Sequence, residues 1–570
     1  AATVLMPFAG TYQLTPEEAM VAKIPLEHGQ TDTATAMSFG FIPGISRFSP
    51  MHGAAWAVTE SLARLAAVGA DPLTARLTFQ EYFERLHNDP SRWGNPTAAL
   101  LGAFLAQREF GVPSIGGKDS MSGSFEQLDV PPTLVSFAVA MTTASGTVSA
   151  AFTEAGRSVC FVPMPMDSAT HLPDFSAAKK LFAAVAALQA EHKITAAAVV
   201  HDGGLSATLT KMCFGNRIGF RFAEKYDAQT LFAPLCGSLI LEGDILDDLK
   251  AAGVSAKLLG KTTNEDSIAV NGEALSLEEL AQAWLATLES VFPNRAKTKA
   301  SLTDVTLFTQ RSETAPAIKA AKPKVFIPAF PGTNCEVDSA RAFEAAGAEP
   351  EILIVRNLTS SDIEETIDAM VKKIDAAQIV MLPGGFSGGD EPDGSGKFIA
   401  TTLRNPRVAD AVMRLLRERD GLMLGICNGF QALIKLGLVP NGTITEIAPN
   451  DPTLTFNTIG RHVSRMAYTR ITSVKSPWFA GVNAGDVFAV PVSHGEGRFV
   501  ADKATIESLA SNGQIATQYC SPDGSPSLDI TWNPNGSEFA IEGITSPDGR
   551  ILGKMGHSER RGENLYKNVP

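Results

Sequence analysis

The sequence lacks the features that mark several special classes of protein. Its six cysteines, at positions 160, 213, 236, 335, 427 and 520, show neither paired nor C-x-x-C spacing, so neither a disulfide framework nor a zinc site is indicated. No stretch of about 18 apolar residues could span a bilayer, and no signal peptide is recognisable. The net charge of −13 argues against a broad surface for nucleic acid or anionic membranes. We therefore expect a protein of the reducing cytoplasm that binds neither nucleic acid nor membrane.

What is present describes an ordinary globular protein of several domains. A chain of 570 residues is too long for one hydrophobic core, and three or four domains are expected. Its hydrophobic content of 44% and charged content of 19% are typical of soluble proteins. The chain begins at Ala1 without a methionine and stops at Pro570, and we expect a fragment or a trimmed form of a longer protein.

The C-terminal part of the chain alternates strand and helix patterns. The predicted strands are 324–330, 351–355 and 378–382, and the predicted helices are 337–346, 361–374 and 408–419. This alternation predicts parallel strands joined by right-handed crossovers, and hence a doubly wound α/β sheet. Ligands of such sheets bind at the carboxyl ends of the strands, where both the loop after Leu382 and Cys427 are expected.

Cys427 lies between an apolar run and a helical pattern, in the stretch Gly425-Ile426-Cys427-Asn428-Gly429. Strand, sharp turn and helix in this order resemble the nucleophile elbow of hydrolases, with sulfur in place of oxygen. The N-terminus of the helix would favour the thiolate and present the sulfur to a substrate. The alternative is a buried cysteine that packs like a small hydrophobic residue.

A nucleophilic cysteine needs an oxyanion hole and a base. The glycines of the loop 383–390 can turn backbone N–H groups toward an oxyanion beside the elbow. The candidate bases are His462, His494 and His557. Two of them, His494 and His557, have a glutamate two residues further on, which can orient the imidazole. A surface or helix-capping histidine is the simpler explanation for each, and the residues alone do not choose between them.

Two stretches in the first half of the chain have a composition that suits phosphate. Gly116-Gly117-Lys118-Asp119-Ser120 follows a short apolar strand and offers bare N–H groups, a cation and a hydroxyl, without the Walker spacing. His201-Asp202-Gly203-Gly204 lies between a predicted strand, 195–200, and a predicted helix, 205–214. There Asp202 could hold Mg²⁺ while N–H groups contact phosphate. A glycine-rich turn and an aspartate helix cap would explain the same residues.

Three more helices are predicted in this half, at 51–67, 97–110 and 175–192. In the first of them, Glu60 and Arg64 lie four residues apart and share a face. On the pattern alone, a surface ion pair is the simplest interpretation of these two residues.

The motifs together resemble those of known families. From Val325 onward the chain resembles the class I glutamine amidotransferases. Phe330-Pro331-Gly332-Thr333-Asn334-Cys335, the glycine loop, the Cys427 elbow and His494-Gly495-Glu496-Gly497-Arg498 are similar to the phosphoribosylformylglycinamidine (FGAM) synthase family, also called FGAR amidotransferases. The stretches 76–83 and 116–122 resemble the synthetase part of its large fused form. The implied fold class is α/β, with AIR-synthetase-like α+β domains before a flavodoxin-like amidotransferase domain.

The resemblance implies a role for each site residue. Cys427 would be the nucleophile, with His557 and Glu559 as its histidine–glutamate pair. Gly385, Phe386 and Asn428 would form the oxyanion hole, His494 would serve positioning or coupling, and Cys335 is expected to be structural. Phosphate and metal would be bound by residues of the first half; the phosphate-binding residues would be Gly116, Gly117, Lys118, Asp119, Ser120, Gly203 and Gly204, and the metal ligands Glu60 and Asp202. Arg64 departs from the asparagine of some relatives, which puts metal binding in doubt.

The implied reaction has two parts. Glutamine hydrolysis at Cys427 would release ammonia, which passes through an internal channel to a synthetase that uses ATP and Mg²⁺ to convert formylglycinamide ribonucleotide (FGAR) into FGAM in purine biosynthesis. Only the later of the family's two tandem synthetase units resembles this chain. We therefore expect an N-terminal synthetase half, of the same polypeptide or of another chain, as partner, and little activity without it.

The resemblance also divides the chain. The expected domains are an N-type synthetase domain at 1–150, a C-type domain at 151–295, a linker at 296–323 and the amidotransferase domain at 324–570. Two other functions stay open: an amidotransferase for a different acceptor, and a degenerate nucleotide-binding scaffold. A phosphatase-like metal site lacks the His/Asp clusters that it would need.

Overall fold

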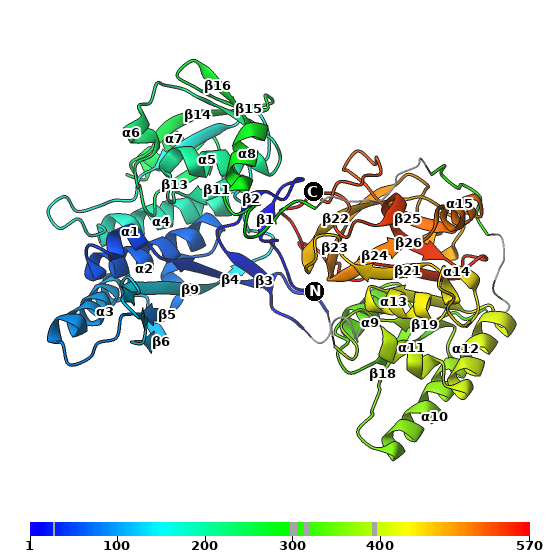
Figure 1. Ribbon diagram of the computed structural model, residues 1–570. Helices are drawn as coiled ribbons and strands as arrows, with labels where there is room; N and C mark the ends of the chain where they lie inside the picture. Colours follow the sequence, from blue (N-terminus) through cyan, green and yellow to red (C-terminus); the bar gives the residue numbers. More distant parts are fainter. Residues whose placement is uncertain (27–28, 297–304, 313–315, 317–318, 390–395) are drawn as a thin grey trace. The chain divides into compact units, whose positions relative to one another are not determined.

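The computed structural model describes residues 1–26, 29–296, 305–312, 316, 319–389 and 396–570. The chain divides into two compact units (Figure 1). Unit 1 comprises Ala1–Thr287 and Gly562–Pro570, and unit 2 comprises Leu288–Arg561. Within the described ranges, no helix is long and apolar enough to cross a membrane.

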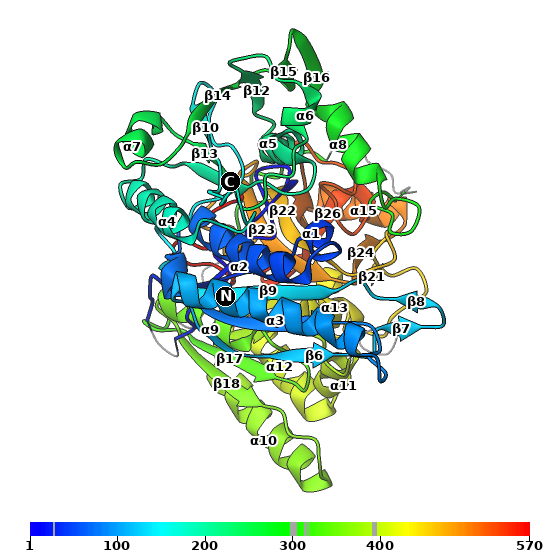
Figure 2. The same ribbon diagram turned by 90° about the vertical axis from the view of Figure 1, so that its left-hand side faces the viewer.

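Unit 1 contains a five-stranded sheet in the order β3-β4-β9-β5-β6. Its strands are β3 Met20–Lys23, β4 Thr33–Gly40, β5 Arg76–Tyr82, β6 Ser114–Ser120 and β9 Thr133–Thr143. Helices α2 (Pro50–Ala67) and α3 (Pro90–Phe110) pack against each other beside this sheet (Figure 2). The predicted helix at 51–67 is confirmed. The one predicted at 97–110 begins earlier, because Asp89 caps it and Pro90 suits a first helical position, and it ends at Gly111 with φ 79°.

Unit 1 also contains a seven-stranded sheet in the order β11-β13-β10-β14-β12-β15-β16. Its strands are β10 Ser158–Val162, β11 Ala196–Val199, β12 Gly219–Phe222, β13 Leu239–Glu242, β14 Lys257–Thr263, β15 Ser267–Val270 and β16 Glu273–Ser276. The helices beside it include α4 Phe175–Ala190, α5 Gly204–Phe214, α7 Leu246–Ala251 and α8 Leu277–Ala286. The strand predicted at 195–200 and the helices predicted at 175–192 and 205–214 are confirmed. The predicted boundary between 150 and 151 falls between the two sheets.

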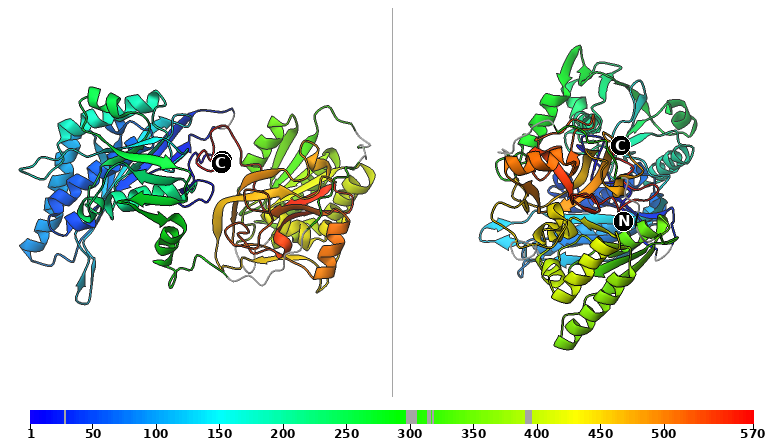
Figure 3. Two further views of the ribbon diagram at one scale, coloured as in Figure 1. Left: turned by 90° about the horizontal axis from the view of Figure 1, so that it is seen from above. Right: turned by 90° about the vertical axis from the view of Figure 1, so that its right-hand side faces the viewer.

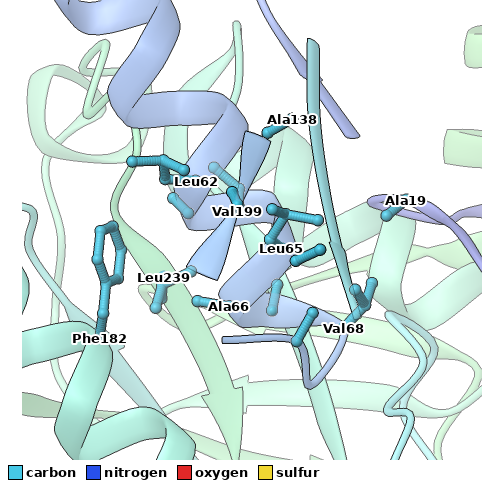
Figure 4. Close-up of a cluster of buried hydrophobic side chains, with 14 of the residues drawn as sticks. Ala19, Leu62, Leu65, Ala66, Val68, Ala138, Phe182, Val199 and Leu239 are labelled. Atoms are coloured by element: carbon cyan, nitrogen blue, oxygen red, sulfur yellow. The ribbon is translucent and has the colours of Figure 1, made fainter. Parts of the chain in front are cut away.

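Helix α2 shares one hydrophobic core with elements of the second sheet. Figure 4 shows the buried side chains that meet there: Leu62, Leu65 and Ala66 of α2, Phe182 of α4, Val199 of β11 and Leu239 of β13. Burial of such side chains stabilises by about 1.5–3 kcal/mol each. The two sheets of unit 1 are therefore held together around α2.

The segment Gly562–Pro570 completes unit 1. The side chain of Asn568 accepts from the N–H of Met6 and donates to its carbonyl, each at 2.8 Å. Nζ of Lys567 donates to three carbonyl oxygens at the end of β9, those of Ala144, Ser145 and Thr147. The last residues of the predicted domain 324–570 thus belong to unit 1, because their hydrogen bonds are made there.

Unit 2 is built on a nine-stranded sheet in the order β18-β17-β19-β20-β27-β26-β25-β22-β23. The parallel strands are β17 Lys324–Ala329, β18 Glu349–Ile354, β19 Ile379–Leu382, β20 Leu422–Ile426 and β27 Ile551–Lys554. The antiparallel extension consists of β26 Ile541–Thr545, β25 Ile515–Tyr519, β22 Val463–Ile471 and β23 Val487–His494. The predicted doubly wound α/β fold is confirmed, and the extension was not predicted.

Helices cover the parallel part of this sheet, which can be followed from two further sides in Figure 3. They are α9 Glu336–Ala345, α10 Ser360–Ala376, α11 Lys397–Leu403, α12 Pro406–Glu418 and α13 Asn428–Lys435. Successive residues of β17 and β19 are buried, which shows that both faces of the sheet are covered. A functional site is therefore expected at the carboxyl ends of the parallel strands.

The predicted linker at 296–323 lies partly outside the described residues. Of the rest, residues 305–312 run along the antiparallel extension of unit 2. The N–H of Phe308 donates to Thr472 O at 2.9 Å, and its carbonyl accepts from the N–H of Val474 at 3.0 Å. This part of the chain is therefore anchored to the sheet and does not act as a free spacer.

Candidate active site

Cys427 lies at the turn between β20 and α13. Its backbone has φ 53° and ψ −106°, an uncommon conformation for a residue other than glycine, and its N–H donates to Lys554 O at 2.8 Å. Such a conformation costs about 1–3 kcal/mol and persists where the surrounding packing fixes it. The strand, turn and helix predicted around Cys427 are present.

The glycines on either side of Cys427 allow this turn. A Cβ atom on Gly425 would lie 2.6 Å from the carbonyl oxygen of Gly429, and one on Gly429 would lie 2.0 Å from that of Leu382. No side chain fits at either position. The two glycines therefore let α13 begin directly against β19 and β20.

His557 reaches the same edge of the sheet from β27, the strand parallel to β20. Its Nδ1 lies 2.6 Å from Oε1 of Glu559, and its backbone N–H donates to Pro491 O at 2.9 Å. Both side chains are buried. Glu559 thus occupies Nδ1 of the imidazole, which leaves Nε2 as the ring nitrogen that can serve Cys427.

The pKa of His557 is determined by opposing effects. Burial by itself would lower it, but the carboxylate of Glu559 and the hydrogen bonds to Cys335 and Cys427 raise the pKa of His557 well above its ordinary value. The imidazolium is therefore favoured beside the sulfur of Cys427. This is the charge arrangement that activates a cysteine nucleophile.

Gly384 provides the space in which these groups meet. A Cβ atom there would lie 2.6 Å from Cε1 of His557, 3.2 Å from Sγ of Cys335 and 3.4 Å from Cβ of Cys427. The three side chains therefore converge on one point of the glycine loop. The structure therefore brings His557, the predicted base, close to Cys427.

A cavity of about 250 Å³ opens at Cys427. Its lining includes all three residues predicted for the oxyanion hole, Gly385, Phe386 and Asn428. The N–H of Phe386, however, donates to Gly332 O at 2.8 Å and is not available to a substrate, which corrects that prediction. Among the described residues, nothing accepts a hydrogen bond from the N–H groups of Gly385 and Asn428. These two are the candidates for binding an oxyanion.

A buried chain of hydrogen bonds fixes the start of α13. Oδ1 of Asn428 accepts from Oγ of Ser387 at 2.6 Å, and its Nδ2 donates to Oε1 of Gln431 at 2.8 Å. Nε2 of Gln431 then donates to Glu496 O at 2.8 Å. These bonds hold the glycine loop, the turn at Cys427 and β24 (Glu496–Val500) in fixed positions relative to one another.

His494 lines the same cavity from the end of β23. Its Nδ1 lies 3.2 Å from Oδ1 of Asn457, and the amide nitrogen of Asn457 donates elsewhere, so Nδ1 carries the proton. Burial, with the charges of His557 and His462, lowers the pKa of His494 to about 3. His494 is therefore neutral at physiological pH. Its Nε2 is a buried acceptor that has no partner among the described residues.

The predicted phosphate loop of unit 1 has a different local structure from the one expected. Gly116, Gly117, Lys118, Asp119 and Ser120 belong to the edge strand β6, which pairs in parallel with β5. A Cβ atom on Gly117 would lie 2.6 Å from Phe79 O, so the glycine permits this close pairing. Glycine composition suggested a loop, and pairing with β5 overrides it.

A cavity of about 420 Å³ borders β6 and is lined by Gly116, Gly117, Asp119 and Glu81, among others. Sequence reasoning gave Glu81 no role. Burial, with the charge of Asp119, raises the pKa of Glu81 to about 7, and its Oε2 has no partner in the described part of the chain. A buried carboxyl group in a cavity is a candidate ligand-binding group.

The predicted metal ligand Glu60 is already fully paired. Its Oε1 lies 3.0 Å from Nδ1 of His201 and 3.3 Å from Arg64, and its Oε2 accepts from the N–H of Phe41 at 3.0 Å. Nε2 of His201 lies 3.0 Å from Glu18, which is also within 3.7 Å of Arg64. The residues do not fit Mg²⁺, because two cationic side chains occupy the place of the metal.

This network also corrects the interpretation of Glu60 and Arg64 as a surface pair, since both are largely buried. Burial by itself would lower the pKa of His201, but Glu18 and Glu60 raise the pKa of His201 to about 9. Sequence spacing could not reveal Glu18, which is far from the others in the chain. The other predicted ligand, Asp202, lies in an exposed turn before Gly203 and Gly204, both with positive φ.

Comparisons with known proteins agree with the geometry of unit 2. Residues 322–570 match the model of the CobB/CobQ-like glutamine amidotransferase domain. Phosphoribosylformylglycinamidine synthase subunit PurQ of Methanococcus maripaludis is 35% identical over 239 residues, which cover 42% of this chain and 82% of that protein. This chain belongs to the phosphoribosylformylglycinamidine synthase family. The predicted enzyme class, a carbon–nitrogen ligase with glutamine as amido donor, is confirmed.

A second family member shows similarity outside the amidotransferase domain. The probable phosphoribosylformylglycinamidine synthase of Arabidopsis thaliana is 28% identical over 420 residues, covering 68% of this chain and 29% of that protein. Since 68% of the chain is more than residues 322–570 contain, the match includes residues before them. Among solved structures, PurLQS from Thermotoga maritima matches with a TM-score of 0.31 and 24% identity, over 43% of this chain and 95% of that one.

Cys335, which was predicted to have only a structural role, lies close to the reacting groups. Sγ of Cys335 lies 3.7 Å from Nδ1 of His557 and 3.0 Å from Nη2 of Arg560. Its position after the Phe330–Asn334 stretch gave no sign of this, because the contact depends on how β17 and β27 are placed in the sheet.

Proposed function

We propose that this chain carries the glutaminase of an FGAM synthase and that the ammonia it releases converts FGAR into FGAM in purine biosynthesis. The observation that carries the proposal is the meeting of Cys427, His557 and Glu559 at the carboxyl ends of β20 and β27. Membership of the family supports the acceptor.

The site residues have distinct parts in the reaction. The proton of Cys427 passes to His557, and Sγ attacks the amide carbon of the glutamine side chain. The N–H groups of Gly385 and Asn428 hold the oxyanion. His557 returns the proton to the leaving nitrogen, which departs as ammonia and leaves a glutamyl thioester. Water, deprotonated by His557, then releases glutamate and restores the thiol.

In this proposal, His494 positions the glutamine substrate. His494 lines the cavity, its Nε2 is a buried acceptor without a partner among the described residues, and its low pKa keeps it neutral, so Nε2 can accept a hydrogen bond from the amide nitrogen of glutamine. His494→Gln should retain part of the activity and His494→Ala little. A rise in KM for glutamine with an unchanged pH profile supports the role, and an unchanged KM in both variants contradicts it.

The synthetase half of the reaction uses ATP. We assign its turnover to a synthetase half provided by further chain or by a partner, because the described contacts of Glu60 leave no place for a magnesium ion at this predicted ligand. The chain also spans only 29% of the length of the Arabidopsis relative. Gly116–Ser120, Gly203 and Gly204 remain our candidates for phosphate contacts in unit 1. All six cysteines are free thiols, which supports the cytoplasm as location.

The decisive experiment is labelling with a glutamine-mimicking electrophile, followed by peptide mapping. We expect modification at Cys427, its loss in Cys427→Ala, and its persistence in the matched variant Cys520→Ala. Glutamate release should fall by about 10³-fold or more in Cys427→Ala. Glutamate release that survives this substitution would refute the proposal.

A second assay tests whether FGAM formation requires a further synthetase half. With glutamine, FGAR, ATP and Mg²⁺, the 570 residues alone should release glutamate weakly and form no FGAM. ATP-dependent FGAM formation by the isolated chain would show that no second synthetase half is required. Replacing FGAR by other acceptors, with ammonia as nitrogen donor and a complementing synthetase half present, separates this function from an amidotransferase for another acceptor.

A further inference from the structure

Three buried side chains beside the reacting sulfur form a set of metal-ligand atoms. Sγ of Cys335, Nδ1 of His557 and a carboxylate oxygen of Glu559 all lie within 4.8 Å of one another. Sulfur, imidazole nitrogen and carboxylate oxygen are the three ligand types that zinc prefers. The reaction described above uses the histidine and the glutamate but gives the cysteine no task.

The separations are close to those of a tetrahedral site. Bond lengths of about 2.3 Å to sulfur and 2.0 Å to nitrogen place the two ligands about 3.6 Å apart. The observed distance from Sγ of Cys335 to Nδ1 of His557 is 3.7 Å. The 2.6 Å hydrogen bond between Nδ1 and Glu559 must open by about 0.7 Å when a metal replaces its proton.

A second observation points to a ligand independently. Oε2 of Glu559 is buried and has no hydrogen-bond partner among the described residues. A buried carboxylate oxygen without a partner is costly unless something binds it. The hydrogen bond to His557 uses Oε1 and leaves Oε2 for a cation.

Two polar side chains contact the sulfur of Cys335. Nη2 of Arg560 donates to its sulfur at 3.0 Å, and Oδ1 of Asn334 lies 3.0 Å from the same atom. The guanidinium competes with a metal ion for the sulfur. A metal that binds here must displace Arg560 from Cys335.

We propose that Cys335, His557 and Glu559 form an inhibitory site for a thiophilic divalent cation of the zinc and cadmium class. The metal takes Sγ, Nδ1 and a carboxylate oxygen, with water or the sulfur of Cys427 as fourth ligand. Binding releases one proton from the thiol and one from Nδ1. The metal then replaces the hydrogen bond between Nδ1 and Glu559, so the contact that orients the ring toward Cys427 is lost, and glutamine hydrolysis stops.

The direct test uses Co²⁺ as a spectroscopic probe in the full chain, and it needs no activity. Cys427→Ala should bind one Co²⁺ and show a sulfur-to-cobalt charge-transfer band. Cys335→Ser in the same background should lose the band, and Cys236→Ser, which changes a partly exposed thiol elsewhere, should keep it. A band that survives Cys335→Ser, or no band in Cys427→Ala, overturns the site.

The second test is inhibition, and it alone rests on the proposed glutaminase. Zn²⁺ should inhibit glutamate release, and EDTA should restore it. Cys335→Ser should raise the inhibitory Zn²⁺ concentration at least tenfold, and Arg560→Met should lower it by removing the competing cation. Equal inhibition of the parent chain and Cys335→Ser would refute the inhibitory role. If a variant releases no glutamate even without added metal, that result concerns the proposed glutaminase and does not affect the cobalt test.

Discussion

Oγ of Ser387 donates a hydrogen bond of 2.6 Å to Oδ1 of Asn428, and so joins the glycine loop to the first residue of α13. Both residues are buried. The bond fixes the distance between the N–H groups of Gly385 and Asn428, which belong to different segments. Ser387→Ala should leave Oδ1 with only the weaker bond from the backbone N–H of Ser387, at 3.2 Å.

For Ser387→Ala we therefore expect a loss of about 1–3 kcal/mol in the free energy of unfolding. Glutaminase kcat should also decrease, because the oxyanion donors lose their fixed spacing. Urea unfolding and steady-state kinetics measure the two effects. Ser508→Ala, in an exposed helix position, is the control and should change neither. A stability equal to that of the parent chain would show that the bond contributes little.

Glu559→Gln should lower kcat by about 10²–10⁴-fold, because the imidazolium loses its counter-charge. The carboxylate raises the pKa of His557, so its removal lowers that pKa. The alkaline limb of the pH–rate profile, where the imidazolium loses its proton, should move to lower pH. Glu507→Gln, on the exposed face of α15 (Lys503–Ser511), should leave the profile in place. An unmoved limb in Glu559→Gln would contradict the assignment.

Gly384→Ala should nearly abolish glutaminase activity while the chain still folds. The new Cβ would lie 2.6 Å from Cε1 of His557, and the ring must move away from Cys427. A displacement of roughly 1 Å at a reacting group lowers the rate by about 10²-fold. Gly481→Ala, where nothing lies within 4 Å of the new atom, is the matched control. Activity within twofold of the parent chain would mean that the ring adjusts without loss.

The stability of unit 1 should depend on pH through His201. Its folded pKa of about 9 lies above the ordinary value of 6.5, because Glu18 and Glu60 favour the imidazolium despite its burial. The stabilisation is fully present below pH 6.5 and is lost as the pH rises through 9. We expect a decrease of about 1–3 kcal/mol over this window, measured by urea unfolding at several pH values. His201→Gln should show a flatter dependence, and an equal slope would exclude His201 as its source.

Local patterns were sufficient for the Cys427 elbow and the parallel strands around it, since both depend on spacing within a few residues. The base could not be chosen in the same way. His494 and His557 each have a glutamate two residues on, and what distinguishes them is that β27 pairs with β20 while β23 lies at the edge of the extension. The resemblance to the FGAM synthase family favoured His557 as the base, whereas the residue types alone did not distinguish it from His494.

The errors share one physical cause, the pairing of distant segments. Gly116–Ser120 has the composition of a loop, yet the ladder with β5 makes it a strand. Glu60 and Arg64 were seen as a pair because they are four residues apart, whereas Glu18 and His201 reach them from other parts of unit 1. Neither contact leaves a periodic signal in the sequence.

The return of Gly562–Pro570 to unit 1 has a consequence for biosynthesis. A ribosome releases residues from the N-terminus onward, yet the carbonyl groups that Lys567 and Asn568 bind belong to residues translated hundreds of codons earlier. Unit 1 can begin to fold early but closes only after unit 2 has been made. In a nascent chain halted before this point, the backbone groups of Met6 that bind Asn568 should be exposed to chaperones and proteases, so that the order of synthesis differs from the order of completion.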